Sequence, residues 1–113
     1  MDEQKKKAGA RSRRRGANGE RELVKILQDK GFDVKRGMVF YGQSDVVGLK
    51  GVHIEVKRVE KLNVHQAMRQ SVQEAKEKGD GIPVVMFRRN REPWMVLSFL
   101  DDWLPMYGAW VDE

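Results

Sequence analysis

Three residues in the middle of the chain, Asp45, Glu55 and Lys57, have the types and spacing for metal-assisted chemistry. Two carboxylates that face each other across a pair of strands repel, unless a positive charge lies between them. A hard divalent cation with oxygen ligands is the natural candidate. Lys57 comes about 6.6–6.8 Å after Glu55 on the same face of a strand, where it would hold a water molecule or a developing phosphate charge beside the metal. The same pattern also fits an ordinary hairpin with a solvated polar face.

A β-hairpin is the element that would bring the two carboxylates together. In residues 52–57 apolar and polar side chains alternate, which is typical of a strand with its apolar face on the core. The preceding residues 45–48 are prone to form a second strand, and the three residues between the two suit a loop that ends at Gly51. This register places Asp45 directly opposite Glu55, with Cβ atoms about 4.5–5.5 Å apart.

A third carboxylate, that of Glu20, is expected on a helix over residues 19–30 that begins at an Asn18 cap and ends at Gly31. Glu20 falls on the inward-facing side of this helix, whereas Glu22 falls on the solvent side. Glu20 therefore either points toward the same site as the other two carboxylates or only complements the helix dipole.

The remaining elements complete an α/β fold with a central mixed β-sheet of about five strands flanked by helices. We expect a strand over 32–41, a helix from Asn63 to Gly79, a buried strand over 82–87, a strand over 94–97, and a last helix capped by Ser98 and ending near Pro105. Gln70 lies on the polar side of the second helix, where it would contact the site or DNA, unless that side is simply solvated.

Residues 1–17 are expected to form a disordered basic tail, and residues 18–113 a single domain. The tail would bind phosphates or serve only for solubility. Its cationic residues are Lys5, Lys6, Lys7, Arg11, Arg13, Arg14 and Arg15.

The composition limits the function further. The net charge of +5 favours a polyanionic partner such as nucleic acid. There is no cysteine, and two histidines are too few for a typical zinc site. No apolar run is long enough to cross a membrane, so we expect a soluble intracellular protein. The expected location is the cytoplasm of a prokaryote, or of the host of a phage that encodes the protein.

Aromatic residues are concentrated in the last quarter of the chain: Trp94, Trp103, Tyr107 and Trp110. A domain of this size cannot easily bury all of them. Some are expected in the core, and the others favour a subunit interface.

The assembled residues resemble the PD-(D/E)XK nuclease superfamily, and more closely the archaeal-type Holliday junction resolvases. The likeness covers about residues 16–58 well and continues loosely into the second helix and the strand after it. It rests on four motifs: Gly19-Glu20-Arg21-Glu22-Leu23-Val24, Gly31-Phe32-Asp33-Val34-Lys35-Arg36, Ser44-Asp45-Val46-Val47-Gly48 and Ile54-Glu55-Val56-Lys57.

The resemblance implies roles for these residues. Asp45, Glu55 and the Val56 carbonyl would be metal ligands, and Glu20 would act on the metal directly or through water. Lys57 would be the catalytic lysine. Arg21 and Arg36 match positions at which the family places arginine on the scissile phosphate, and Arg58, Gln70 and the tail complete the expected DNA-binding residues. The long basic tail and the tryptophan-rich end depart from the family pattern.

The expected function is metal-dependent endonucleolytic resolution of Holliday junctions by paired symmetric nicks, carried out by a homodimer on branched DNA. Carboxylate and carbonyl ligands favour Mg²⁺, with Mn²⁺ as a substitute and no other cofactor. Two alternatives stay open: a nickase or repair-type nuclease of the same superfamily that acts on flaps or duplex DNA, and a non-catalytic nucleic-acid-binding domain.

Overall fold

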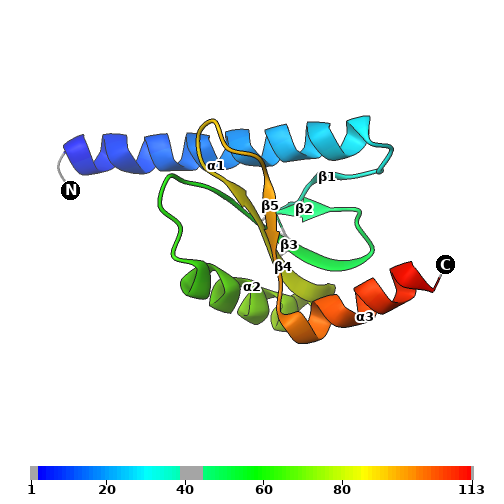
Figure 1. Ribbon diagram of the computed structural model, residues 1–113. Coiled ribbons are helices and arrows are strands. Elements are labelled where there is room, and N and C mark those ends of the chain that lie inside the picture. The colour runs from blue at the N-terminus through cyan, green and yellow to red at the C-terminus, as the bar shows by residue number, and fades with distance from the viewer. Residues whose placement is uncertain (1–2, 39–44, 113) are drawn as a thin grey trace.

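The computed structural model describes residues 3–38 and 45–112, with side chains from residue 16 onward (Figure 1). Its elements are α1 (Glu3–Asp29), β1 (Lys35–Arg36), β2 (Val46–Val47), β3 (Gly51–Arg58), α2 (Val64–Lys78), β4 (Gly81–Arg88), β5 (Met95–Leu97) and α3 (Leu100–Val111). The five strands form one mixed sheet in the order β1-β2-β3-β4-β5. The predicted α/β fold with a central mixed sheet is confirmed.

The register of the predicted hairpin is also confirmed. Val46 of β2 lies opposite Ile54 of β3 in an antiparallel pair, and the Asp45 N–H donates to the Ile54 carbonyl at 3.0 Å. Asp45 is therefore opposite Glu55, as the loop length predicts. On its other edge β3 pairs with β4 in parallel, with Glu55 beside Val85.

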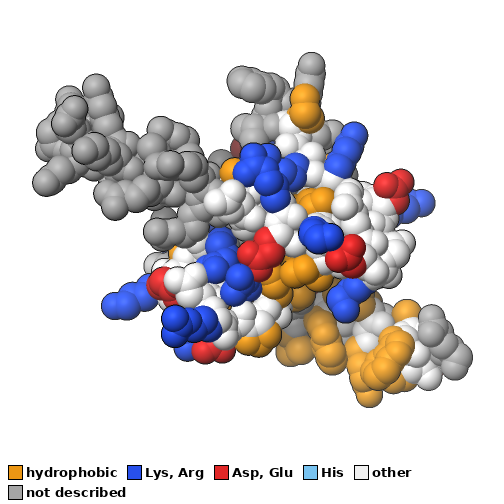
Figure 2. All heavy atoms as spheres, turned by 90° about the horizontal axis from the view of Figure 1, so that it is seen from above, with side chains coloured by type: hydrophobic (Ala, Val, Ile, Leu, Met, Phe, Trp, Pro, Cys, Tyr) orange, Lys and Arg blue, Asp and Glu red, His pale blue; other side chains and the backbone are white. Residues whose placement is uncertain are grey.

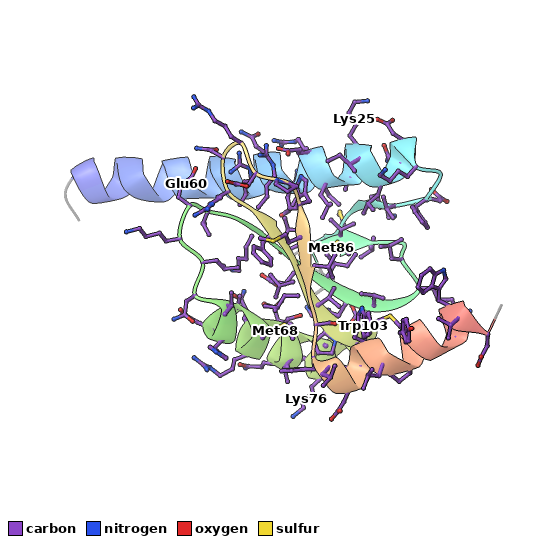
Figure 3. The ribbon with its side chains drawn as sticks, viewed as in Figure 1. Lys25, Glu60, Met68, Lys76, Met86 and Trp103 are labelled. Atoms are coloured by element: carbon purple, nitrogen blue, oxygen red, sulfur yellow. The ribbon has the colours of Figure 1, made fainter. Side chains whose placement is uncertain are left out.

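Each face of the sheet is covered by a helix, so β3 is buried on both faces. On one face α1 packs on a core that includes Leu23, Ile54 and Val84. On the other, α2 packs on Val85 through Ala67 and Met68. Figure 3 labels Met68, which points from α2 toward the sheet.

The polar face of β3 is therefore not the solvated face of an ordinary hairpin. His53 is 0% and Glu55 4% exposed. The amphipathic helix α2 places its apolar side chains on this face of the sheet and so covers both residues.

Helix α2 begins and ends where the sequence predicts. The Asn63 side chain accepts the Gln66 N–H at 3.0 Å, and Gly79 closes the helix in the left-handed conformation with φ of 63°. Between these caps the buried Ser71 hydroxyl donates to the Val84 carbonyl at 3.0 Å, which links the helix to strand β4.

Helix α1 begins at Glu3, so the expected start at Asn18 is wrong, and residues 3–17 are helical where a disordered tail was expected. Lysine, arginine, glutamine and alanine dominate this segment and favour helix, and its glycines do not stop it. The proposed domain boundary at residue 18 stays a prediction. Of the strand expected over 32–41, only Lys35–Arg36 is a strand, and its last three residues lie outside the described ones.

Two expectations for the last helix are wrong. Its N-cap is Phe99 without a side-chain hydrogen bond, not Ser98, and Pro105 lies inside the helix rather than near its end. None of the residues in α3 is buried, and Trp103 and Trp110 are 47% and 68% exposed. Figure 2 shows apolar side chains gathered at this end of the molecule. In the part of the chain that the structure describes, no helix is long and apolar enough to cross a membrane.

Candidate metal and nuclease site

The carboxyl groups of Asp45 and Glu55 lie together at the edge between β2 and β3. Asp45 immediately precedes β2, and its Oδ2 accepts the Val56 N–H at 2.8 Å, which fixes the direction of the side chain. Its carboxyl group lies near that of Glu55, because each affects the pKa of the other. The two predicted ligands are therefore on the same side of the sheet.

Burial raises the pKa of both groups. The pKa of Glu55 rises to about 9, first because the side chain is desolvated and then because Glu74 and Asp45 lie beside it. The pKa of Asp45 is also raised, mainly by burial, against the lowering effect of the Val56 N–H. Two buried carboxyls this close favour a bound proton or a cation between them. The donor set fits a divalent metal ion.

Gln70 of α2 connects the acidic residues with the lysine. Its Nε2 donates to Glu55 Oε1 at 3.0 Å and to Glu74 Oε1 at 3.2 Å, and its Oε1 accepts from Lys57 Nζ at 2.9 Å. Lys57 Nζ also lies 3.6 Å from Glu55 Oε1. Gln70 thus contacts the site, one of the two possibilities that the sequence left open. Its contact with DNA stays a prediction.

Glu74 is a member of the site that the sequence analysis missed. It lies one helical turn after Gln70, and the position of its carboxyl group beside Glu55 is among the causes that raise the Glu55 pKa. Acidic residues on the polar side of a helix are usually solvated, so the sequence around Glu74 did not indicate that this residue belongs to a site. The four-residue spacing from Gln70, on a helix that must cover β3, was the pattern that could have found it.

Glu20 lies near the edge of this cluster. Its pKa is raised, chiefly by burial and next by the charge of Asp45, while Arg36 opposes the shift. Arg36 Nη2 lies 3.4 Å from Glu20 Oε1. Arg21 is exposed and donates to Asn18 Oδ1 at 3.1 Å. The structure thus brings Glu20 and Arg36 to the acidic pair and leaves Arg21 at the surface beside them.

Glu22 does not lie on the solvent side, as the helix periodicity suggested. It accepts from Arg88 Nε at 2.6 Å and from Trp94 Nε1 at 3.0 Å, and its Oε2 lies 4.0 Å from Arg58 Nε. Arg58, which directly follows Lys57, is thus held by an ion pair with Glu22. Its guanidinium group also donates to Asn90 Oδ1 at 2.7 Å. Its role in DNA binding stays a prediction. The side chains of the seven basic residues in 5–15 lie outside the described ones.

Comparison with known proteins identifies the family. The family model for archaeal Holliday junction resolvase (Hjc) matches residues 11–104, which is most of the chain. The chain belongs to this resolvase family. Among solved structures, the Holliday junction resolvase Hjc of Archaeoglobus fulgidus, an archaeal hyperthermophile, is similar with a TM-score of 0.54 and 25% identity over 74% of this chain and 71% of that one. No curated protein sequence matches significantly.

Membership in the resolvase family confirms the function predicted from the motifs, a Holliday junction resolving endonuclease. It also confirms the chemistry at the level of a nuclease, and Glu55 and Glu74 form a candidate metal-binding group together with His53. The identity of the ion, the dimer and the role of each residue go beyond the comparisons.

Proposed function

We propose that this resolvase cuts two symmetric phosphodiester bonds of a four-way junction by Mg²⁺-dependent hydrolysis, acting as a homodimer. The observation that supports this most is the buried pair of Asp45 and Glu55 with Lys57 beside it. Such a pair is costly for folding when both carboxyls are charged and no cation is bound between them.

In this proposal Asp45, Glu55 and the Val56 carbonyl hold the ion, and Glu20 holds it directly or through a water molecule. The N–H and C=O groups of a strand residue point to the same edge. Because the Val56 N–H donates to Asp45, its carbonyl points to the edge where Asp45 lies. When bound, Mg²⁺ lowers the pKa of a water molecule and neutralises charge on the phosphate. Mn²⁺ would serve as a substitute.

Lys57 orients the attacking water or helps to remove its proton. Its ammonium group is held between Gln70 Oε1 and Glu55 Oε1, so it is positioned before DNA binds. Because the side chain is 28% exposed, it can contact a phosphate that enters the site.

DNA would reach the site over basic and amide side chains. A groove beside Lys57 is lined by Lys61, Asn63, Gln66 and Gln70, which can donate to phosphate oxygens. Arg21 and Arg36 lie on the Glu20 side of the site, and the basic residues of 5–15 extend the cationic part of α1. These contacts recognise DNA shape rather than sequence, because phosphates carry no sequence information.

Two symmetric cuts require two sites in a fixed relation, which a twofold dimer supplies. The apolar surface of α3 and β5 is the surface we propose for this dimer. Val96, Leu100 and Trp110 are each at least 64% exposed there. A patch of this kind is unusual on a monomer and is typical of an interface.

The decisive experiment compares Mg²⁺-dependent cleavage of a mobile four-way junction with that of a matched linear duplex. We expect symmetric nicks near the branch point by the wild-type protein. Asp45→Asn and Glu55→Gln should cleave at least about 100-fold more slowly, because each loses a ligand to the ion. Both variants should still bind the junction. Undiminished cleavage by both would contradict the proposed site, and equal cutting of the linear duplex would indicate a nickase.

A further inference from the structure

His53, on β3 beneath α2, is a buried histidine that the proposed nuclease chemistry does not use. The side chain is 0% exposed. Its Nδ1 lies 2.9 and 3.0 Å from the two carboxylate oxygens of Asp80, which precedes β4. Its Nε2 is buried and has no hydrogen-bond partner. Asp80 thus holds Nδ1 as the protonated nitrogen, which leaves the Nε2 lone pair free.

Two carboxylate oxygens lie around this free nitrogen. Glu74 Oε2 is 3.5 Å from His53 Nε2. Glu55 Oε2 is buried and has no hydrogen-bond partner. The Oε1 atoms of both glutamates accept from Gln70, so their Oε2 atoms are the ones left available. One ligand atom from each of the three residues lies within 4.8 Å of the other two.

We propose that His53, Glu55 and Glu74 bind a divalent transition-metal ion, such as Mn²⁺, Co²⁺ or Zn²⁺, at a position distinct from the Asp45 side of Glu55. Glu55 belongs to both positions, whereas His53 and Glu74 belong only to this one. The sequence argument that two histidines are too few for a zinc site does not exclude it, because one imidazole and two carboxylates are sufficient ligands.

The distance between two of the three ligand atoms fits such an ion. Metal–nitrogen and metal–oxygen bonds of about 2.1 Å at a tetrahedral angle place two ligand atoms about 3.4 Å apart. The distance between His53 Nε2 and Glu74 Oε2 is 3.5 Å. The contact of His53 Nδ1 with the Asp80 carboxylate is the support that metal-binding histidines usually have, since it fixes the tautomer and the ring orientation.

The ligand types determine which ions the position would take. Mg²⁺ prefers oxygen ligands and gives up its waters reluctantly, whereas transition metals accept imidazole readily. We therefore expect Mg²⁺ to bind weakly here. The position also lies between two elements, because His53 and Glu55 come from β3 and Glu74 from α2. A bound ion would tie α2 to the sheet and raise the thermal stability of the protein.

The test is a titration of the metal-free full-length protein with Co²⁺, followed by visible absorption and by calorimetry. Asp45→Asn serves as the background, because it removes the other position while keeping this one. In that background His53→Gln and Glu74→Gln should each weaken Co²⁺ binding at least about tenfold. His65→Gln is the matched control, since His65 is the other histidine of the chain and is exposed on α2. It should bind Co²⁺ within twofold of the background protein.

A second readout does not depend on any variant. In the ¹⁵N-histidine spectrum of the wild-type protein, Zn²⁺ should shift the Nε2 resonance of His53 and leave that of His65 in place. Unchanged Co²⁺ affinity in Glu74→Gln, or an unshifted His53 resonance, would overturn the proposal even if His53→Gln failed to fold. Both measurements are made without DNA, so they are independent of the cleavage experiment and can fail separately from it.

Discussion

At the scale of single residues, the buried carboxyl of Glu55 should make the metal-free protein less stable as the pH rises. Its pKa is raised from 4.5 to about 9 in the folded protein. When folding raises the pKa of a group, the group contributes stability that is complete below its pKa in the unfolded protein. This stability is lost as the pH rises through its pKa in the folded protein. The relevant window is therefore between about pH 4.5 and 9.

Glu55→Gln removes this titration while keeping an oxygen that can accept from Gln70. We expect the variant to match the wild type at pH 5 and to exceed its unfolding free energy at pH 8 by at least about 1 kcal/mol, since one pKa unit corresponds to about 1.4 kcal/mol. Urea denaturation in the presence of a chelator measures both values. If the unfolding free energies of the two proteins changed with pH in parallel, burial of the Glu55 carboxyl would not make the protein less stable at high pH.

Gln70 should act on catalysis through Lys57. In Gln70→Ala the ammonium group loses its 2.9 Å hydrogen bond, and Glu55 Oε1 loses a donor. We expect kcat for junction cleavage to fall about tenfold, while junction affinity changes little. Gln73→Ala is the matched control, because Gln73 is exposed on the same helix and its Nε2 donates to Glu77 Oε1 at 3.4 Å, away from Lys57. Equal kcat values for Gln70→Ala and Gln73→Ala would show that Gln70 does not position Lys57 for cleavage.

At the scale of elements, two glycines of α1 should respond oppositely to alanine. A Cβ at Gly19 would lie 2.7 Å from the Arg58 Cβ, where α1 crosses β3, whereas a Cβ at Gly16 would meet nothing within 4 Å. Gly16→Ala should stabilise the protein by about 0.5–1 kcal/mol, because alanine favours helix. Gly19→Ala should destabilise it by about 1–3 kcal/mol through overpacking.

The two variants are compared by urea denaturation at one pH. The Gly16 substitution also tests whether α1 continues as a helix before residue 18. A destabilised Gly16→Ala would indicate that the residues before Asn18 are not helical in solution.

The sequence was most informative where the structure depends on local rules. The hairpin register followed from a loop length and an alternating pattern, so the pairing of Asp45 with Glu55 was predictable. The caps of α2 followed from Asn63 and Gly79 in the same way. Residue types and motif order then sufficed for the family and for the main acidic pair.

Tertiary packing decided what the sequence left out. Glu74 joins the site only because α2 lies across β3, and the same packing buries His53, whose apparent surface position hid its contacts with Asp80. The start of α1 was misplaced because Asn18 looks like a cap although the residues before it also favour helix. Pro105 was taken as a helix end, yet it lies in the second turn of α3.

At the scale of the whole molecule, the exposed apolar side chains of α3 should hold two copies together. Trp110 is 68% exposed, and large aromatic residues often contribute most to binding at such interfaces. Trp110→Glu should therefore weaken dimerisation at least about tenfold and slow paired cleavage, as measured by sedimentation and by the fraction of junctions cut on both strands. Lys25→Glu, on the exposed side of α1, is the control and should leave the dimer intact. A wild-type protein that is monomeric with and without DNA would exclude this arrangement.

Strand β3 supplies alternate residues to two separate layers, with Ile54 and Val56 beneath α1 and Glu55 beneath α2. A single residue inserted or deleted within it would exchange these two sets, which would place carboxylates in the hydrophobic core beneath α1 and aliphatic side chains in the acidic site beneath α2. Evolution can therefore lengthen or shorten this enzyme in its turns, but every homologue that keeps the activity should preserve the length of this one strand.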